Sequence, residues 1–311
     1  MTHDILGLHH ITAIAGKPSV NYRFYKEVLS LRLIKKTVNF DDPGSYHLYY
    51  GNEDGTPGTV ITFFPWEGAG KGTPGIGMAT ETCFSVPAQS LSFWADRLKT
   101  LGVVTGELEE RFGNIHLPFS DPDGLSLSMV DASVLDERKG SRSGTVAAGF
   151  AIKGFNTVTL SLRKIDETAK LLTDIFGYRI ASHEGNRYRF ITDAINTSNS
   201  IDLLEVPDGK RGHVSTGSHH HVAFRVNNKA TQMEFREKIL EIGIHITEQI
   251  DRTYFNSIYF REPGGVLFEI ATDTPGFTVD EELSLLGSSL KLPGQFEPSR
   301  AEIEENLPDL Y

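Results

Sequence analysis

Four times along the chain, the spacing of hydrophobic residues changes from the period of a strand to the period of a helix. Residues 8–16 alternate between polar and apolar side chains, which is typical of a half-buried strand. Residues 19–31 then carry apolar side chains at helical spacing. Extended segments rich in β-branched and aromatic residues follow at 31–40, 46–51 and 59–66. This first unit therefore predicts a strand, a helix and three further strands.

Three later units follow the same plan. Their opening strands are predicted at 79–86, 155–162 and 219–226. Their helices are predicted near 88–101, 165–176 and 229–242, and each ends before a glycine, the usual left-handed stop. Units two and four close on the tight hairpins DPDG and EPGG before a final strand. The pattern predicts an α+β fold of four βαβββ units.

The second half of the chain repeats the first. Arg32 has a counterpart in Arg179, 147 residues later, and residues 119–129 are matched by 260–270. A repeat at a nearly fixed offset indicates a duplicated scaffold. We therefore expect two domains, at 1–150 and 151–272, followed by a capping tail at 273–311. Residues 131–150, at the end of the first domain, should form the linker between the halves. The tail should end in a short helix.

Composition narrows the classes of function. The 311 residues are 39% hydrophobic and 23% charged, as in ordinary soluble globular proteins. The net charge of −11 argues against nucleic acid or an anionic membrane as a partner, because phosphates repel an acidic surface. A single cysteine, Cys83, excludes an intrachain disulfide and fits a reducing compartment. With neither a signal-peptide pattern nor a membrane-spanning stretch, we expect a cytoplasmic protein, as a monomer or a homo-oligomer.

Three residues stand out as candidate metal ligands. His10, His221 and Glu269 fall at corresponding strand positions of the repeated unit, whereas their counterparts in the other half are Thr157, Glu81 and Ser128. An ionised carboxylate within the apolar strand VLFEIA is costly unless it is paired or bound to a cation. Two imidazoles and one carboxylate on one face form the ligand set of non-haem Fe(II) oxygenases.

Each candidate also has a structural interpretation. A strand histidine is more often a hydrogen-bonded core residue than a ligand, and Glu269 has Arg252 as an alternative partner. Neighbouring strand residues point to opposite faces, so His9 and His10 are not expected to face one cavity, nor are neighbours within 219–221. The remaining histidines, His47 among them, carry no assigned chemistry. The coincidence of three candidates at equivalent positions favours the metal site.

The motifs HHITA, FYKEVLSLRLIKKTVN, HHHVAF and EPGGVLFEI, together with the βαβββ units, resemble the vicinal oxygen chelate (glyoxalase/extradiol dioxygenase) superfamily. Within it, the whole chain most resembles hydroquinone ring-cleaving dioxygenases of the 2,6-dichlorohydroquinone 1,2-dioxygenase type. The resemblance implies two glyoxalase-like domains with open, curved mixed β-sheets, and Fe(II) bound by His10, His221 and Glu269. It also implies that five further residues act around the metal, namely His9, Thr12, His220, Arg252 and Tyr259.

The expected function is Fe(II)-dependent, extradiol-type ring cleavage of a hydroquinone-like or catechol-like aromatic with O2. Mn(II) suits the same ligands. One alternative is a metal-dependent isomerase or lyase of the glyoxalase kind, whose sites usually carry two carboxylates where this chain offers one. Another is a non-catalytic small-molecule-binding protein of the superfamily, which would lack the metal ligands.

The repeat also predicts how the units pair. Units one and two together offer His10, Glu81 and Ser128, while units three and four offer Thr157, His221 and Glu269, so neither pair completes the site. Pairing unit one with unit four collects all three ligands and leaves a metal-free pseudo-site in units two and three. We therefore expect one site per chain, formed by the outer units of one chain or exchanged between two copies.

Overall fold

Each of the four units folds as a strand, a helix and three strands. The computed structural model describes residues 5–131, 136–142 and 144–311, so part of the expected linker 131–150 lies outside the described residues. Unit one contains β1 (Leu8–Ala15), α1 (Pro18–Tyr22, continued by a π-helical turn to Val28), β2 (Arg32–Asn39), β3 (Asp42–Gly51) and β4 (Val60–Pro65). Unit two contains β5 (Met78–Val86), α2 (Leu91–Thr100), β6 (Glu109–Arg111), β7 (Asn114–Ser120) and β8 (Ser126–Asp131).

The second half continues this order. Unit three contains β9 (Gly154–Leu162), α3 (Asp166–Lys170, continued by a π-helical turn to Ile175), β10 (Arg179–Glu184), β11 (Arg187–Ile191) and β12 (Ser200–Glu205). Unit four contains β13 (Ser218–Val226), α4 (Lys229–Glu241), β14 (Ile250–Asp251), β15 (Asn256–Arg261) and β16 (Leu267–Thr272). The tail contains three short 3₁₀ turns and the helix α5 (Arg300–Asn306), at the end where a helix was expected.

Local chemistry explains where the helices stop and start. Gly102, Gly177 and Gly243 follow the predicted helices and have φ of 72°, 75° and 80°, a conformation that costs glycine least. At the start of α4, the Asn228 side chain accepts a hydrogen bond from the Thr231 amide and so caps a free donor.

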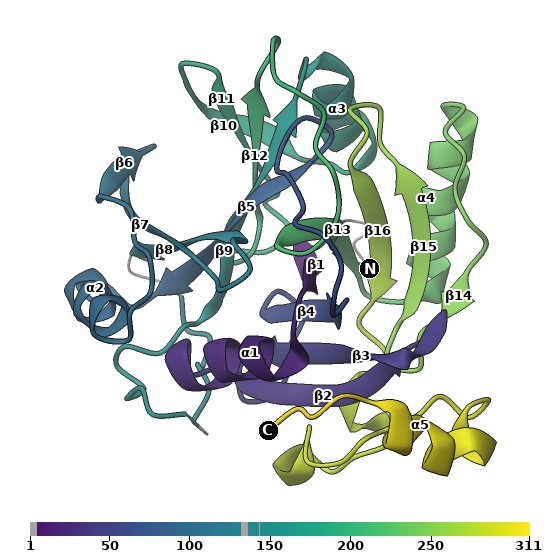
Figure 1. Cartoon of the computed structure of the whole chain (residues 1–311). Coiled ribbons are helices and arrows are strands. Elements are labelled where there is room, and N and C mark those ends of the chain that lie inside the picture. Colours follow the sequence, from purple (N-terminus) through teal and green to yellow (C-terminus); the bar gives the residue numbers. More distant parts are fainter. Residues whose placement is uncertain (1–4, 132–135, 143) are drawn as a thin grey trace.

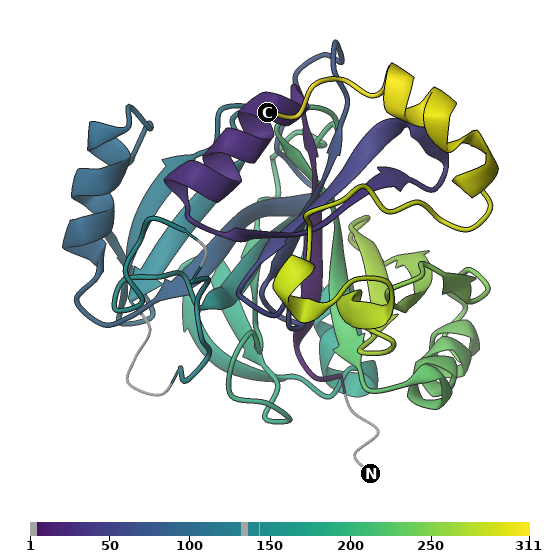
Figure 2. The same ribbon diagram turned by 90° about the horizontal axis from the view of Figure 1, so that it is seen from below.

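The strands form two eight-stranded sheets, each built from one unit of either half (Figures 1 and 2). The outer-unit sheet joins units one and four in the order β14-β15-β16-β13-β1-β4-β3-β2. The inner-unit sheet joins units three and two in the order β10-β11-β12-β9-β5-β8-β7-β6. Opening strands meet antiparallel at the centre of both, β1 with β13 and β5 with β9. The pairing of unit one with unit four thus agrees with the expectation, and it occurs within one chain. The proposed domain boundaries stay a prediction.

The tail lies along the free edge of the outer-unit sheet (Figure 1). Lys36 of β2 accepts a backbone hydrogen bond from Lys291, and the buried Lys35 ammonium binds Asp280 at 2.6 Å and Glu281 at 2.5 Å. Phe277 of the tail packs against the rings of Tyr49 and Phe255, which lie beside the site described next. Among the described residues, no helix has the length and apolar character of a membrane span.

Candidate metal centre

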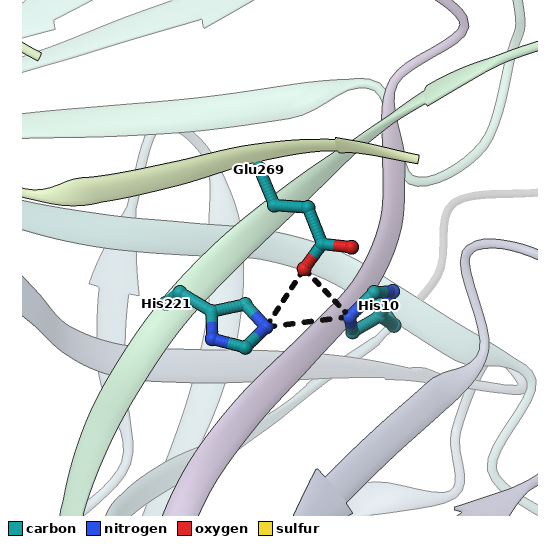
Figure 3. A group of neighbouring side chains, drawn as sticks. All are labelled: His10, His221 and Glu269. Carbon is teal, nitrogen blue, oxygen red and sulfur yellow. Dashed lines mark hydrogen bonds and ion pairs between the residues drawn. The ribbon is translucent and has the colours of Figure 1, made fainter. Parts of the chain in front are cut away.

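Two histidines and one glutamate converge from three neighbouring strands of the outer-unit sheet (Figure 3). His10 comes from β1, His221 from β13 and Glu269 from β16. Glu269 Oε2 lies 3.2 Å from His10 Nε2 and 2.9 Å from His221 Nε2, and the two nitrogens are 3.4 Å apart. All three side chains are buried. They form the one group of potential metal ligands found among the described residues.

A neighbouring histidine contacts each of the two candidate imidazole ligands. His10 Nδ1 lies 2.9 Å from His9 Nδ1, and His221 Nδ1 lies 2.8 Å from His220 Nδ1. His9 also bonds the backbone at Thr272, which requires a ring N–H from His9. His9 Nδ1 is then the acceptor and His10 Nδ1–H the donor, so His10 Nε2 keeps a free lone pair. Such partners fix the tautomer of metal-binding histidines.

Two β-bulges place these partner histidines. On β1, Leu8 pairs with Phe224 but His10 pairs with Ala223, so His9 is an extra residue. On β13, the register skips His220 in the same way. A bulge re-aims side chains and breaks strict alternation. The expectation that neighbours cannot face one cavity was therefore wrong for His220 and His221, which both line the cavity, whereas His9 does not.

The electrostatics of the cluster suit a cation. Burial raises the pKa of Glu269, but the two imidazoles outweigh burial and hold this pKa well below its ordinary value. Burial lowers the pKa of His221 and of His9, so both stay neutral. Ser257 donates to Glu269 Oε1 at 2.5 Å, and Glu269 Oε2 faces only the two imidazole nitrogens among the described contacts. A buried carboxylate oxygen that faces two imidazole nitrogens from neighbouring strands is a donor set that a divalent metal can bind.

A cavity of about 430 Å³ opens over the cluster. Its lining includes the candidate ligands His10 and His221, the apolar side chains Phe64, Trp66, Phe255 and Leu267, and polar groups from both units. Arg252 and Tyr259 form one wall. The Arg252 guanidinium lies 3.3 Å from the Tyr259 hydroxyl and 5.6 Å from the ring of Phe40, which belongs to the β2–β3 turn. A small planar molecule would meet aromatic walls and a fixed cation here.

The opposite wall contains two residues that sequence reasoning missed, His47 and Tyr49 of β3. The Tyr49 hydroxyl lies 2.8 Å from His47 Nδ1, and His47 Nε2 lies 2.9 Å from Thr62 Oγ1. Thr62 in turn contacts Thr12 Oγ1 at 2.8 Å, so the Thr12 hydroxyl is fully buried and lies outside the cavity lining. Alternation along YHLYY puts His47 and Tyr49 on one face, but only the sheet order brings this face to the metal ligands.

The inner-unit sheet carries ion pairs at the corresponding positions. Glu81, the counterpart of His221, binds Arg111 at 2.5 Å and accepts from Ser128 at 2.8 Å. Burial opposes ionisation of Glu81, but these contacts with Arg111 and Ser128 lower its pKa overall. Arg111 is itself the counterpart of Arg252 in the repeat. The guanidinium thus neutralises the carboxylate directly.

Comparisons with known proteins agree with this architecture. Residues 154–270 match the family model "Glyoxalase/Bleomycin resistance protein/Dioxygenase superfamily". The chain is 46% identical to "Putative ring-cleaving dioxygenase MhqO" of Bacillus subtilis, over 99% of this chain and 97% of that protein. It is 32% identical to the chlorohydroquinone/hydroquinone 1,2-dioxygenase of Sphingobium indicum, over 97% and 96% of the two chains.

A solved structure is similar over nearly the whole chain. It is a crystal structure of a "putative dioxygenase" from Bacillus subtilis, with a TM-score of 0.95 and 45% identity, covering 99% of this chain and 98% of that one. The chain therefore belongs to the glyoxalase/bleomycin resistance protein/dioxygenase superfamily, and within it to the family whose named members are ring-cleaving dioxygenases.

Proposed function

We propose that the protein is an Fe(II)-dependent dioxygenase that opens the ring of a hydroquinone-like or catechol-like aromatic with O2. The observation that carries the proposal is the buried cluster of His10, His221 and Glu269 at the floor of an aromatic-lined cavity. The names of the relatives support the same reaction class. Because hydroquinone hydroxyls are not adjacent, we propose extradiol-type cleavage, beside a hydroxyl-bearing carbon.

The donor set fits Fe(II), and Mn(II) accepts the same ligands. Bound there by His10, His221 and Glu269, the metal would supply open coordination positions for substrate and O2 together and would favour the phenolate over the phenol. His9 and His220 keep the two imidazoles in the tautomer that the metal requires.

The residues of the cavity wall act on the substrate. Arg252 remains a cation and stabilises negative charge on the ring oxygens as a fixed donor. Burial raises the pKa of Tyr259, so this residue donates a hydrogen bond as the neutral phenol. Burial lowers the pKa of His220 to about 3, so its imidazole is neutral; with Nδ1 facing His221, its Nε2–H donates a hydrogen bond to a bound oxygen. Phe64, Trp66 and Phe255 orient the ring and exclude water.

Oxygen uptake with defined substrates tests the proposal. The protein is loaded with Fe(II) without oxygen, and O2 consumption is then measured across a panel of hydroquinones and catechols. We expect one O2 consumed per ring opened, with both atoms of ¹⁸O2 found in the product by mass spectrometry. Stoichiometric iron binding without O2 uptake for any ring in the panel would refute the reaction while leaving the metal site intact.

A further inference from the structure

Two hairpin turns of the outer-unit sheet meet at the cavity. The end of β2 and the turn to β3 contribute Asn39, Phe40 and Asp41 to the lining, and the β14–β15 turn contributes Arg252. Arg252 Nη1 lies 4.0 Å from Asp41 Oδ2. The Arg252 side chain is 19% exposed and that of Asp41 is 83% exposed. The cation therefore lies inside the cavity wall, and the carboxylate lies at its solvent-facing rim.

These two residues carry opposite charges within one lining. Apart from its histidines, the described cavity lining contains one cation, Arg252, and one anion, Asp41. The remaining lining side chains are aromatic, aliphatic, amide or hydroxyl groups. Because the two charged groups face each other, the field of the guanidinium in the cavity is partly cancelled by the carboxylate.

The ion pair leaves the hydrogen-bond donors of Arg252 free. Arg252 Nε faces the Tyr259 hydroxyl at 3.3 Å, but the 4.0 Å between Nη1 and Asp41 is too long for a hydrogen bond. A guanidinium has five N–H donors in a fixed fork. Arg252 can therefore still donate to a ligand oxygen, while Asp41 offsets its surplus charge.

The inner-unit sheet shows that this meeting of hairpins belongs to the scaffold. There the backbone amide of Phe112 donates to both oxygens of Glu184, at 2.9 and 3.0 Å. Phe112 directly follows Arg111, the counterpart of Arg252, and Glu184 ends β10. An acidic side chain of one hairpin thus meets the arginine-bearing hairpin in both sheets. In the outer-unit sheet the acid faces the guanidinium itself.

We propose that Asp41 is a specificity-determining residue, which makes the cavity select aromatic rings without a carboxylate substituent. The inference rests on the proposed function. At the floor, the charge of a divalent metal exceeds that of Glu269 by one, which a single phenolate balances. A carboxylate elsewhere on the ring adds a second negative charge. Arg252 attracts this charge, but Asp41 repels it, and discrimination by such repulsion is a general source of specificity.

The test compares 2,5-dihydroxyphenylacetate with its methyl ester, which has a similar shape and no charge. Dissociation constants are measured without O2 on the full-length Co(II)-loaded protein, from the visible spectrum of Co(II). We expect the wild type to bind the ester more tightly. In Asp41→Asn this preference should fall by about fivefold or more, which is the effect of one unit charge on another roughly 4 Å away in water.

A neighbouring acid provides the matched control. Asp42→Asn removes the same charge from an exposed position outside the cavity lining, and should leave the preference within about twofold of wild type. In the wild type, the preference should also shrink at about 1 M salt, where charges are screened within roughly 3 Å.

Two results would overturn the role of Asp41: an ester preference that is equal in the wild type and Asp41→Asn, or tighter binding of the acid than of the ester by the wild type. Binding of neither ring to the Co(II)-loaded protein would instead refute the proposed function, and this inference with it.

Discussion

The Nε of Arg252 lies 3.3 Å from the hydroxyl of Tyr259, and the two side chains face the cavity together. Their counterparts in the inner-unit sheet have diverged. Arg111 binds Glu81, and Pro118 stands where Tyr259 would be. In the outer-unit sheet a cation and a phenol thus face the cavity, whereas in the inner-unit sheet the corresponding cation pairs with a carboxylate.

This relationship predicts that Tyr259→Phe and Arg252→Ala act on turnover and not on metal content. Each removes a donor to developing charge, so kcat should fall by roughly 10²-fold or more with the metal retained. Metal analysis and steady-state kinetics on the same samples check this. Arg111→Ala is the matched control and should leave turnover per folded molecule unchanged. Loss of metal in Tyr259→Phe would contradict this role.

Alanine in place of His10, His221 or Glu269 should abolish stoichiometric metal binding and activity. Each change removes one of three ligands from a buried centre. Metal content after dialysis, with circular dichroism to verify the fold, is the measurement. Glu81→Gln, at the position equivalent to His221, serves as the control and should bind one metal per chain. Full metal content in any of the three alanine variants would exclude that residue as a ligand.

The bulge histidines should control affinity for the metal. His9→Ala frees His10 Nδ1, and His220→Ala frees His221 Nδ1, so each should weaken metal binding by roughly 10–100-fold. His219→Ala is a suitable control because His219 bonds Thr82 of the inner-unit sheet at 2.8 Å. An affinity equal to that of wild type in both His9 and His220 variants would mean that the bulges serve the fold alone.

Sequence alone predicted the βαβββ units, the helix ends and the pairing of unit one with unit four. These predictions follow from the hydrophobic periodicity, from the glycines after the helices and from the sequence repeat, all of which are visible in a single sequence. It did not predict the bulges at His9 and His220, since a bulge is a property of two paired strands. His47 was missed for the same reason. Its role depends on Thr62, a neighbour that only the sheet order supplies.

Acid should destabilise the protein through its buried histidines. Burial lowers the pKa of His116 to about 4, below the value of about 6.5 expected in the unfolded chain. The unfolded state then binds the extra proton, so this contribution to stability is full above pH 6.5 and is lost as the pH falls toward 4.

Urea unfolding of the apoprotein at several pH values measures this effect. In His116→Asn the slope of unfolding free energy against pH should fall by about one proton, or ~1.4 kcal/mol per pH unit, between pH 6.5 and 4.5. Above pH 7.5, the unfolding free energies of the wild type and of His116→Asn should change with pH in parallel. Asp121, whose pKa burial raises to about 7, opposes the trend equally in both. An unchanged slope would show that His116 is protonated in the fold.

Lys35→Met should detach the tail from the outer-unit sheet. Lys35 is fully buried, and its removal leaves Glu281, with a side chain 3% exposed, without its cation. Breaking such a pair costs roughly 3–5 kcal/mol. Urea unfolding measures the loss. Lys36→Met, on the half-buried neighbour whose ammonium bonds the Tyr311 hydroxyl at the surface, should change stability by less than about 0.5 kcal/mol. A loss as small for Lys35→Met would mean that the tail is held by its apolar contacts.

The exchange of units between the two sheets sets an order of events during synthesis of the chain. β1 leaves the ribosome first, yet its central partner β13 begins 210 residues later and Glu269 of β16 later still. Contacts so distant in sequence form slowly, and an unpaired strand edge is open to wrong partners while it waits. A nascent chain stopped after unit three would contain His10 but neither His221 nor Glu269, and so could not complete the proposed metal site.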